Sequence, residues 1–115
     1  MPDLRAISLA AIYGTFASLA SVAGDIGRGE VVYKGTCLAC HGSDGGGSLP
    51  GVPDLAGRTG PLSQADAVLL RRMTAGFQTP GSPMAMPPRG GDPALTDADL
   101  NAVLQYMRKE FLPAR

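Results

Sequence analysis

The segment Cys37-Leu38-Ala39-Cys40-His41 restricts the possible folds of this chain more than any other part of its sequence. It contains both cysteines and the single histidine of the 115 residues. The chain also has 16 glycines and 10 prolines, but only three tyrosines and three phenylalanines. Such a composition gives long loops and a thin core, which usually requires disulfides, a metal or a bound group. Two cysteines form at most one disulfide, so we expect something else to complete the core.

The spacing C-x-x-C-H is the attachment signature of c-type haem. Two thiols three positions apart at the end of a helix can each add to one of the two haem vinyl groups. The adjacent imidazole then lies under the iron as its proximal ligand. We therefore predict one haem c, bound covalently through Cys37 and Cys40, with His41 as an axial ligand. The porphyrin would supply the core that the side chains lack.

Three other roles of these residues are minor alternatives. A structural zinc site needs about four nitrogen and sulfur ligands, whereas two cysteines and one histidine supply three. A thioredoxin-type redox pair belongs in a βαβ unit, and no segment here alternates as a strand would. A plain disulfide suits an exported protein but would leave the core thin.

The second axial ligand is predicted by elimination among the methionines. The chain has no second histidine, and methionine is the usual partner of histidine in electron-transfer haems. Met73 and Met107 fall on apolar helix faces, so we expect them to fill the core. Met86 is the preferred ligand because Pro87 keeps its backbone extended. Met84, two residues earlier, is the alternative.

Three segments have the apolar periodicity of amphipathic helices. We expect these helices over about 25–37, 63–75 and 96–112. Segments rich in glycine and proline at 42–61 and 78–95 are typical of loops. The sequence therefore predicts an all-α fold of three or four short helices, whose long loops wrap around the haem.

Capping residues predict where these helices begin and end. Asp25 is a candidate N-cap of the first helix. Ser63 and Asp66 resemble a capping box that opens the second helix, which Gly76 would end. Thr96 opens the third helix, whose apolar stripe consists of Leu100, Val103, Leu104, Met107 and Phe111.

Residues 1–23 have a different character from the rest. A short start with one arginine precedes an uncharged run over 6–23, which ends in the small-x-small sequence Ser21-Val22-Ala23. We predict a secretory signal over 1–23 and one domain over 24–115. A retained anchor, or a helix that belongs to the fold, is the alternative. Export to the periplasm agrees with covalent haem attachment, which takes place outside the bacterial cytoplasm, and membrane association is expected only if residues 1–23 are retained.

The charges of the chain balance. Ten Lys and Arg residues face ten Asp and Glu residues. The chain therefore lacks the basic excess that nucleic-acid binding requires, and we predict no nucleic-acid partner. Long-range steering of partners by net charge is not expected either.

Together, these residues resemble the class I c-type cytochromes, in particular short bacterial members of the cytochrome c-five group. The resemblance covers about residues 27–111. Gly29 looks like the glycine of the family's first helix that packs against the last helix, and Tyr106 stands where the family has an aromatic residue contacting the first helix. The run over 84–96, Met-Ala-Met-Pro-Pro-Arg-Gly-Gly and onward, looks like the family's ligand loop and implies Met86 as the iron ligand.

The resemblance also implies two residues beside the haem. The carbonyl of Pro53 would accept a hydrogen bond from Nδ1 of His41, which would fix the orientation of the imidazole. Arg58 would lie near a haem propionate. The additional cysteine pair of some c-five members is absent from this chain.

The expected function is one-electron transfer rather than enzymatic catalysis. The protein would be a free shuttle or the haem subunit of a periplasmic dehydrogenase, with a dehydrogenase or a terminal oxidase or reductase as redox partner. The partner would dock on uncharged surfaces that include 47–53 and 80–88. The alternative is a ligand-binding or peroxidase-like haem protein with a labile methionine. That chemistry needs an open iron position and a distal acid–base group. The chain has no second histidine to serve as that distal group.

Overall fold

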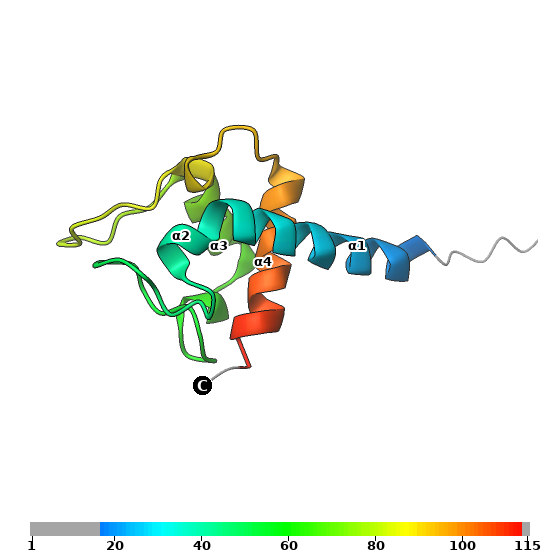
Figure 1. Ribbon diagram of the computed structural model, residues 1–115, viewed down its shortest axis with the longest axis horizontal. Helices are drawn as coiled ribbons and strands as arrows, with labels where there is room; N and C mark the ends of the chain where they lie inside the picture. The colour runs from blue at the N-terminus through cyan, green and yellow to red at the C-terminus, as the bar shows by residue number, and fades with distance from the viewer. Residues whose placement is uncertain (1–16, 114–115) are drawn as a thin grey trace, which may run out of the picture.

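The computed structural model describes residues 17–113, and for 17–24 only the backbone. The helices are α1 (Ala17–Val32), α2 (Leu38–His41), α3 (Asp66–Ala75) and α4 (Asp97–Phe111) (Figure 1). A π-helical turn, η1 (Tyr33–Cys37), joins α1 to α2, and two 3-10 turns, η2 (Pro61–Ser63) and η3 (Pro88–Gly91), lie in the loops. Across the described residues no strand forms, and Phe77 and Met86 make an isolated bridge. The prediction of an all-α fold with three or four short helices is confirmed.

The first helical run is longer than the sequence predicts. The helix is already formed at Ala17, so Asp25 lies inside α1 and is not its N-cap. The residues over 17–24 are mostly Ala, Ser, Val and Leu, which are compatible with a helix. Because the helix begins before Asp25, the N–H groups around Asp25 are not the unpaired ones of a helix start and need no cap. The run ends at Gly42, whose φ of 85° suits a glycine.

The predicted signal falls largely on residues that lie outside the described part of the chain. Positions 1–16 are not described, whereas the backbone of 17–23 is helical and continues into α1. In Figure 1 the first turns of α1 extend away from the other helices. Over the described residues, no helix combines the length and the apolar character needed to cross a membrane.

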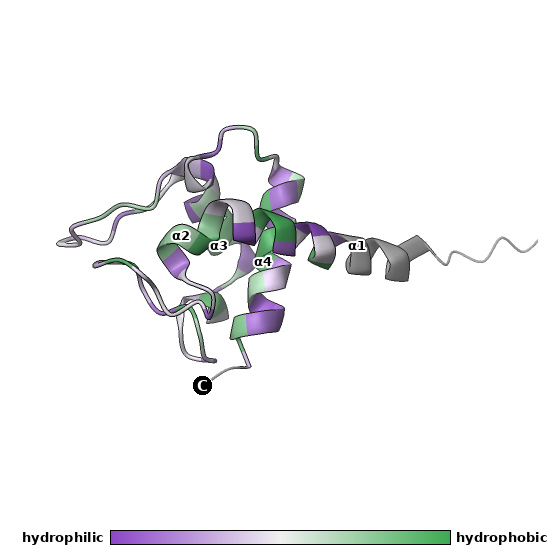
Figure 2. Ribbon diagram, viewed as in Figure 1, coloured by the Kyte–Doolittle hydropathy of each residue, from purple (hydrophilic) through white to green (hydrophobic). Residues whose placement is uncertain are grey.

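Helix α4 forms as the sequence predicts. The Oγ1 atom of Thr96 accepts a hydrogen bond from the N–H of Asp99 (3.1 Å), and the Asp99 carboxylate accepts one from the N–H of Thr96 (3.0 Å). This reciprocal capping box satisfies two N–H groups at the helix start. The predicted apolar stripe is buried throughout, at Leu100, Val103, Leu104, Met107 and Phe111. Figure 2 shows apolar residues of α4 gathered where α1 crosses it.

Helices α1 and α4 cross at very close range at Gly29. A β carbon placed on Gly29 would lie 2.2 Å from the carbonyl oxygen of Ala102. Beside this crossing, the ring of Tyr33 lies 5.5 Å from that of Tyr106 and 5.2 Å from that of Phe111, measured between ring centres. The expected packing of the first helix against the last, with Tyr106 as a contact, is therefore confirmed.

Helix α3 begins three residues later than predicted. Ser63 lies in η2 and donates its hydroxyl to the carbonyl of Gly60 (2.6 Å). The helix starts at Asp66 after Ala65, whose methyl group cannot accept a capping hydrogen bond. The predicted capping box of Ser63 and Asp66 is therefore wrong, because the 3-10 turn uses the serine first. The end of the helix at Gly76 is as predicted.

An arginine of α4 fixes the position of the start of α3. Arg108 donates to the carbonyls of Leu62 (3.2 Å) and Gln64 (2.7 Å) and forms an ion pair with Asp66. These bonds hold the start of α3 against α4. A long-range contact thus positions this helix start, and no side chain of the N-cap residue, Ala65, caps it.

Substitution of Gly29 tests the helix crossing. We expect Gly29→Ala to lower the free energy of unfolding by about 1–3 kcal/mol, because its β carbon cannot fit against the Ala102 carbonyl without moving α4. Urea denaturation followed by circular dichroism measures the change. Gly27→Ala is the matched control: nothing lies within 4 Å of its β carbon, so it should stabilise the helix by about 0.5–1 kcal/mol. Equal effects of the two substitutions would contradict the close crossing.

An ion pair between α1 and α4 predicts that the stability of the protein depends on pH. Nε of Arg28 lies 2.9 Å from the carboxylate of Asp99. This hydrogen bond, followed by that from the Thr96 N–H, lowers the pKa of Asp99 from 3.8 to about 2. A lowered folded-state pKa stabilises the protein above the unfolded value and is lost as the pH falls through the folded value. We therefore expect Asp99→Asn to destabilise at neutral pH, with a difference from wild type that shrinks between pH 3.8 and about 2. A difference independent of pH in denaturant titrations would argue against this pair.

Candidate haem site

The three residues of the C-x-x-C-H motif stand at the end of the first helical run and line one cavity. Cys37 is the last residue of η1, and Cys40 and His41 belong to α2. π-Helical turns are rare and often mark functional sites. The Tyr33 hydroxyl donates to the carbonyl of Gly42 (2.5 Å), which ties the end of α2 back to η1. The chain therefore holds the motif in a fixed helical frame.

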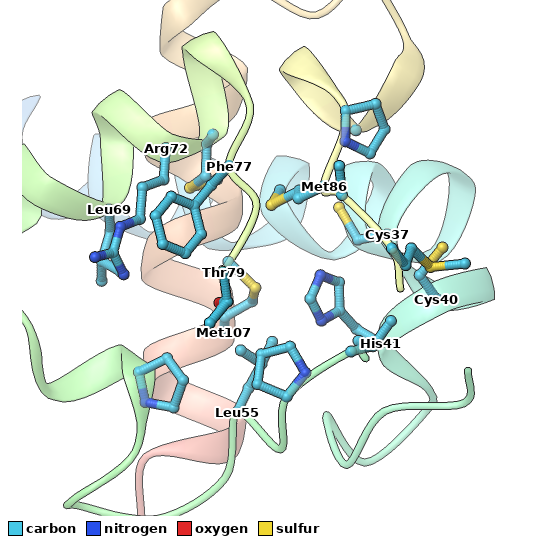
Figure 3. Close-up of a pocket in the computed structure, with 18 of the residues that line it drawn as sticks. Cys37, Cys40, His41, Leu55, Leu69, Arg72, Phe77, Thr79, Met86 and Met107 are labelled. Atoms are coloured by element: carbon cyan, nitrogen blue, oxygen red, sulfur yellow. The ribbon is translucent and has the colours of Figure 1, made fainter. Parts of the chain in front are cut away.

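The cavity has a volume of about 270 Å³ and is lined mainly by apolar side chains. The motif forms one side, and α3 and α4 form the inner wall through Leu69, Met73, Leu104 and Met107. Residues of the segments over 51–55, 61–64 and 77–87 form most of the rest of the lining. Figure 3 shows His41 and Met86 on the same cavity, reached from α2 and from the loop before η3. Such a lining suits a large apolar group.

Both candidate methionine ligands reach the cavity, but their surroundings differ. The backbone of Met86 makes two hydrogen bonds with that of Phe77 (3.0 and 2.8 Å), and its side chain packs against the core. Met84 is 37% exposed, and its backbone N–H and carbonyl both bond to the hydroxyl of Ser82. The backbone of Met86 is therefore anchored to a neighbouring segment, whereas that of Met84 is tied only within its own loop.

The other two methionines of the described residues occupy the places predicted for them. Met73 of α3 and Met107 of α4 are each 6% exposed and belong to the core. Both also line the cavity. These side chains thus belong both to the hydrophobic core and to the wall of the cavity.

The imidazole of His41 is partly buried, and burial lowers its pKa. The neutral form, which binds metals, is therefore favoured. Nδ1 is buried without a hydrogen-bond partner among the described residues. The hydrogen bond predicted from Nδ1 to the Pro53 carbonyl is thus not formed, although Pro53 lines the cavity. In a metal-binding histidine, a metal at one ring nitrogen and a hydrogen-bond acceptor at the other fix the orientation of the ring together. The position of the Pro53 loop alone does not orient the imidazole of His41 for this hydrogen bond.

Cys37 is a buried thiol, whereas Cys40 is partly exposed. Burial, followed by the nearby Cys40, raises the pKa of Cys37 to about 11. A redox-active cysteine needs a lowered pKa, so this environment disfavours a thioredoxin-type pair. The sulfurs of Cys37 and Cys40 are not bonded to each other. In the described part of the chain, no three His, Cys, Asp or Glu side chains gather in a group that could hold a metal ion.

Arg58 is the one predicted site residue that lies apart from the cavity. It lines a separate, more open pocket with Ser63, Leu112 and Pro113. The segment over 57–60 is held to the far end of α4 by a hydrogen bond from the N–H of Gly57 to the Phe111 carbonyl (3.0 Å). Because this bond fixes the loop at the end of α4, Arg58 lies away from the C-x-x-C-H motif.

Arg72 is a cavity residue that the sequence analysis missed. Its guanidinium carbon lies 4.0 Å from the centre of the Phe77 ring. No other Lys, Arg, Asp or Glu occurs among the described residues that line the cavity, and the ion pairs of the described chain do not include Arg72. The available signal was its position three residues after Leu69, which puts an arginine beside the apolar stripe of α3.

The donor set of the cavity fits a covalently attached haem. Two thiols that are not bonded to each other, a neutral imidazole and a thioether converge on an apolar space. The guanidinium of Arg72 matches a carboxylate of such a group. The residues present therefore suffice to bind a haem, orient it and shield it from water.

Comparison with known proteins gives a consistent picture. A family described as cytochrome c oxidase, cbb3-type, subunit III, matches residues 24–107. Cytochrome c-555 of Prosthecochloris aestuarii is 31% identical, over 76% of this chain and 90% of the relative. Cytochrome c-554(548) of Halomonas halodenitrificans is 32% identical, over 73% of this chain and 94% of the relative. No solved structure matches significantly.

Proposed function

Because this chain belongs to the cytochrome c family, as a class I c-type cytochrome, we propose that it carries single electrons between redox proteins outside the cytoplasm through one covalent haem c. The observation that carries the proposal is the convergence of Cys37, Cys40, His41 and Met86 on one apolar cavity. When bound, the haem supplies iron that gains or loses one electron.

The residues of the chain would divide the tasks of binding and tuning. Cys37 and Cys40 would hold the haem covalently, and His41 and Met86 would bind the iron as axial ligands. Pairing histidine with methionine raises the reduction potential relative to other ligand pairs. Because the backbone of Met86 is anchored to Phe77, little would need to move between oxidation states.

Arg72 is the residue that we expect to face a haem carboxylate, in place of Arg58. Its guanidinium lies on the cavity, whereas Arg58 lines a different pocket. A guanidinium and a carboxylate form a charge-assisted hydrogen bond, which is about twice as strong as a neutral one. Stacking on Phe77 would hold the arginine in place.

The proposed location is the periplasm, with residues 1–23 removed on export. The uncharged run over 6–23 and its small-x-small end support export. The protein would then serve as a free shuttle or as the haem subunit of a dehydrogenase. Retention of residues 1–23 would instead anchor the same domain at a membrane.

The redox partner would dock on a charge-free rim, defined here as segments 45–53 and 76–88. Neither segment contains a charged residue or a histidine. The two segments meet where a β carbon on Gly51 would lie 2.7 Å from the Ser82 hydroxyl. The rim exposes Leu49 (40%), Phe77 (39%) and Met84 (37%) beside the cavity. Depletion of charge is typical of the core of a protein interface, so this rim suits a transient, apolar contact.

The ligand assignment predicts how the visible spectrum responds to substitution. We expect oxidised wild type, matured with haem, to give a low-spin spectrum with the weak far-red iron–thioether band. Met86→Ala should abolish that band, because the anchored ligand is lost. Met84→Ala, the matched control two residues away, should keep it.

Three spectroscopic results would count against this assignment. Loss of the band in Met84→Ala alone would transfer the ligand role to Met84. A high-spin wild-type spectrum would favour the ligand-binding or peroxidase-like alternative. The absence of haem absorbance would remove the electron-carrier proposal altogether.

The charge-free rim predicts the salt dependence of electron exchange between oxidised and reduced copies of the protein. The polypeptide has no net charge and the rim contains no charged residue, so the wild-type rate measured by NMR exchange should vary little with ionic strength. Leu49→Lys should slow the exchange at low salt, because two like charges then meet, and added salt should restore it by screening. Val31→Lys is the control, since Val31 is 61% exposed but lies on α1, outside the rim. Equal slowing by both substitutions would refute docking at the rim.

A further inference from the structure

The turn after the Met86 loop has an unusual backbone. Arg89, Gly90 and Gly91 are successive residues with positive φ, at 54°, 66° and 89°. The left-handed region costs glycine little, but it is unfavourable for a residue with a β carbon. Among the non-glycine residues of the described chain, Arg89 alone has a positive φ. Such a conformation persists only where surrounding contacts enforce it, and these positions often serve function.

The side chain of Arg89 supplies those contacts. Its Nη1 atom donates to the carbonyl of Leu95 (2.8 Å), and its Nη2 atom to the carboxylate of Asp97 (2.6 Å). The arginine side chain is 25% exposed, so it folds back on the protein rather than pointing into solvent. Two N–H groups of one planar guanidinium thus connect the turn η3 to the beginning of α4.

The connected turn lies directly after the methionine that we place on the iron. Only Pro87 and Pro88 separate Met86 from Arg89, and proline restricts the backbone to few conformations. On the other side of the turn, a β carbon on Gly90 would lie 2.8 Å from the methyl group of Thr36, next to Cys37. A movement of η3 away from α4 would therefore pull Met86 away from the cavity.

We propose that Arg89 is a positioning residue that keeps Met86 on the haem iron by fastening its loop to α4. This inference rests on the proposed function, because it takes Met86 as an axial ligand. An external ligand can replace Met86 only in the fraction of molecules whose loop has opened. Its apparent affinity therefore reports the closed-to-open equilibrium of the loop. The Arg89 bonds lower the open fraction without touching the iron.

The test is the affinity of imidazole for the oxidised, haem-loaded protein, followed through loss of the far-red iron–thioether band. We expect Arg89→Ala to raise imidazole affinity by about tenfold, the lower end of what the loss of a hydrogen bond to a charged group gives. Asp97→Asn should raise it by about twofold, because an exposed ion pair contributes less. The double variant should resemble Arg89→Ala alone, since both substitutions remove the same connection.

Arg28→Ala is the matched control, because it also removes an arginine that binds the first turn of α4. Arg28 lies on α1 and donates to Asp99 rather than to the ligand loop, so this variant should lower overall stability and leave imidazole affinity unchanged. Arg89→Gly separates the connection from the backbone conformation. Glycine suits the left-handed turn, so an affinity at or below the wild-type value in this variant would mean that the conformation alone matters, and would overturn the proposal.

Two further results complete the test. If Arg89→Ala does not fold, as judged by circular dichroism, Arg89→Lys replaces it. The lysine ammonium cannot donate to two acceptors in the planar geometry of the guanidinium. An imidazole affinity of Arg89→Lys between that of wild type and the tighter value expected for Arg89→Ala supports the proposal, and an affinity equal to that of wild type overturns it. If Met86 were not a ligand, the wild-type band would be absent or would survive in Met86→Ala. That result would refute the ligand assignment itself, whereas a wild-type band with unchanged imidazole affinity in Arg89→Ala would refute only the role of Arg89.

Discussion

The contact between Gly29 and the backbone of Ala102 sets the geometry on which the rest of the molecule depends. Only a residue without a side chain allows α1 to approach α4 so closely. The crossing directs the next turn of the first helical run into the core, where Tyr33 is 1% exposed and packs on Phe111. In a chain with so few aromatic residues, this cluster supplies much of the available packing.

The crossing also determines where the haem-binding motif lies. Cys37, Cys40 and His41 continue the helical run that Gly29 anchors, so their position relative to α4 is fixed by the same contact. The inner wall is then formed by Met73 and Met107, which belong to the hydrophobic core. The same side chains therefore pack the core and line the haem cavity. A bound haem would extend the core, so few large side chains are enough to stabilise the fold.

The other side of the cavity depends on long-range polar contacts rather than on helix packing. Phe77 holds the backbone of Met86 by two hydrogen bonds, and Arg108 holds the start of α3. Arg72 brings a positive charge to an otherwise uncharged lining. Loops rich in glycine and proline have little structure of their own, so these contacts define which of their residues face the cavity.

The sequence alone was sufficient for the C-x-x-C-H motif, the apolar stripe of α4 and its cap at Thr96, because each depends on spacing along one helix. It was also sufficient to choose Met86 and Met84 as the loop methionines that reach the cavity. It was misleading at Asp25, which lies inside an upstream helix, and at Ser63, whose hydroxyl is bonded within a 3-10 turn. Only the tertiary structure placed Arg72 rather than Arg58 on the cavity. The physical reason is that loop positions are decided by contacts between residues distant in sequence, which local patterns do not encode.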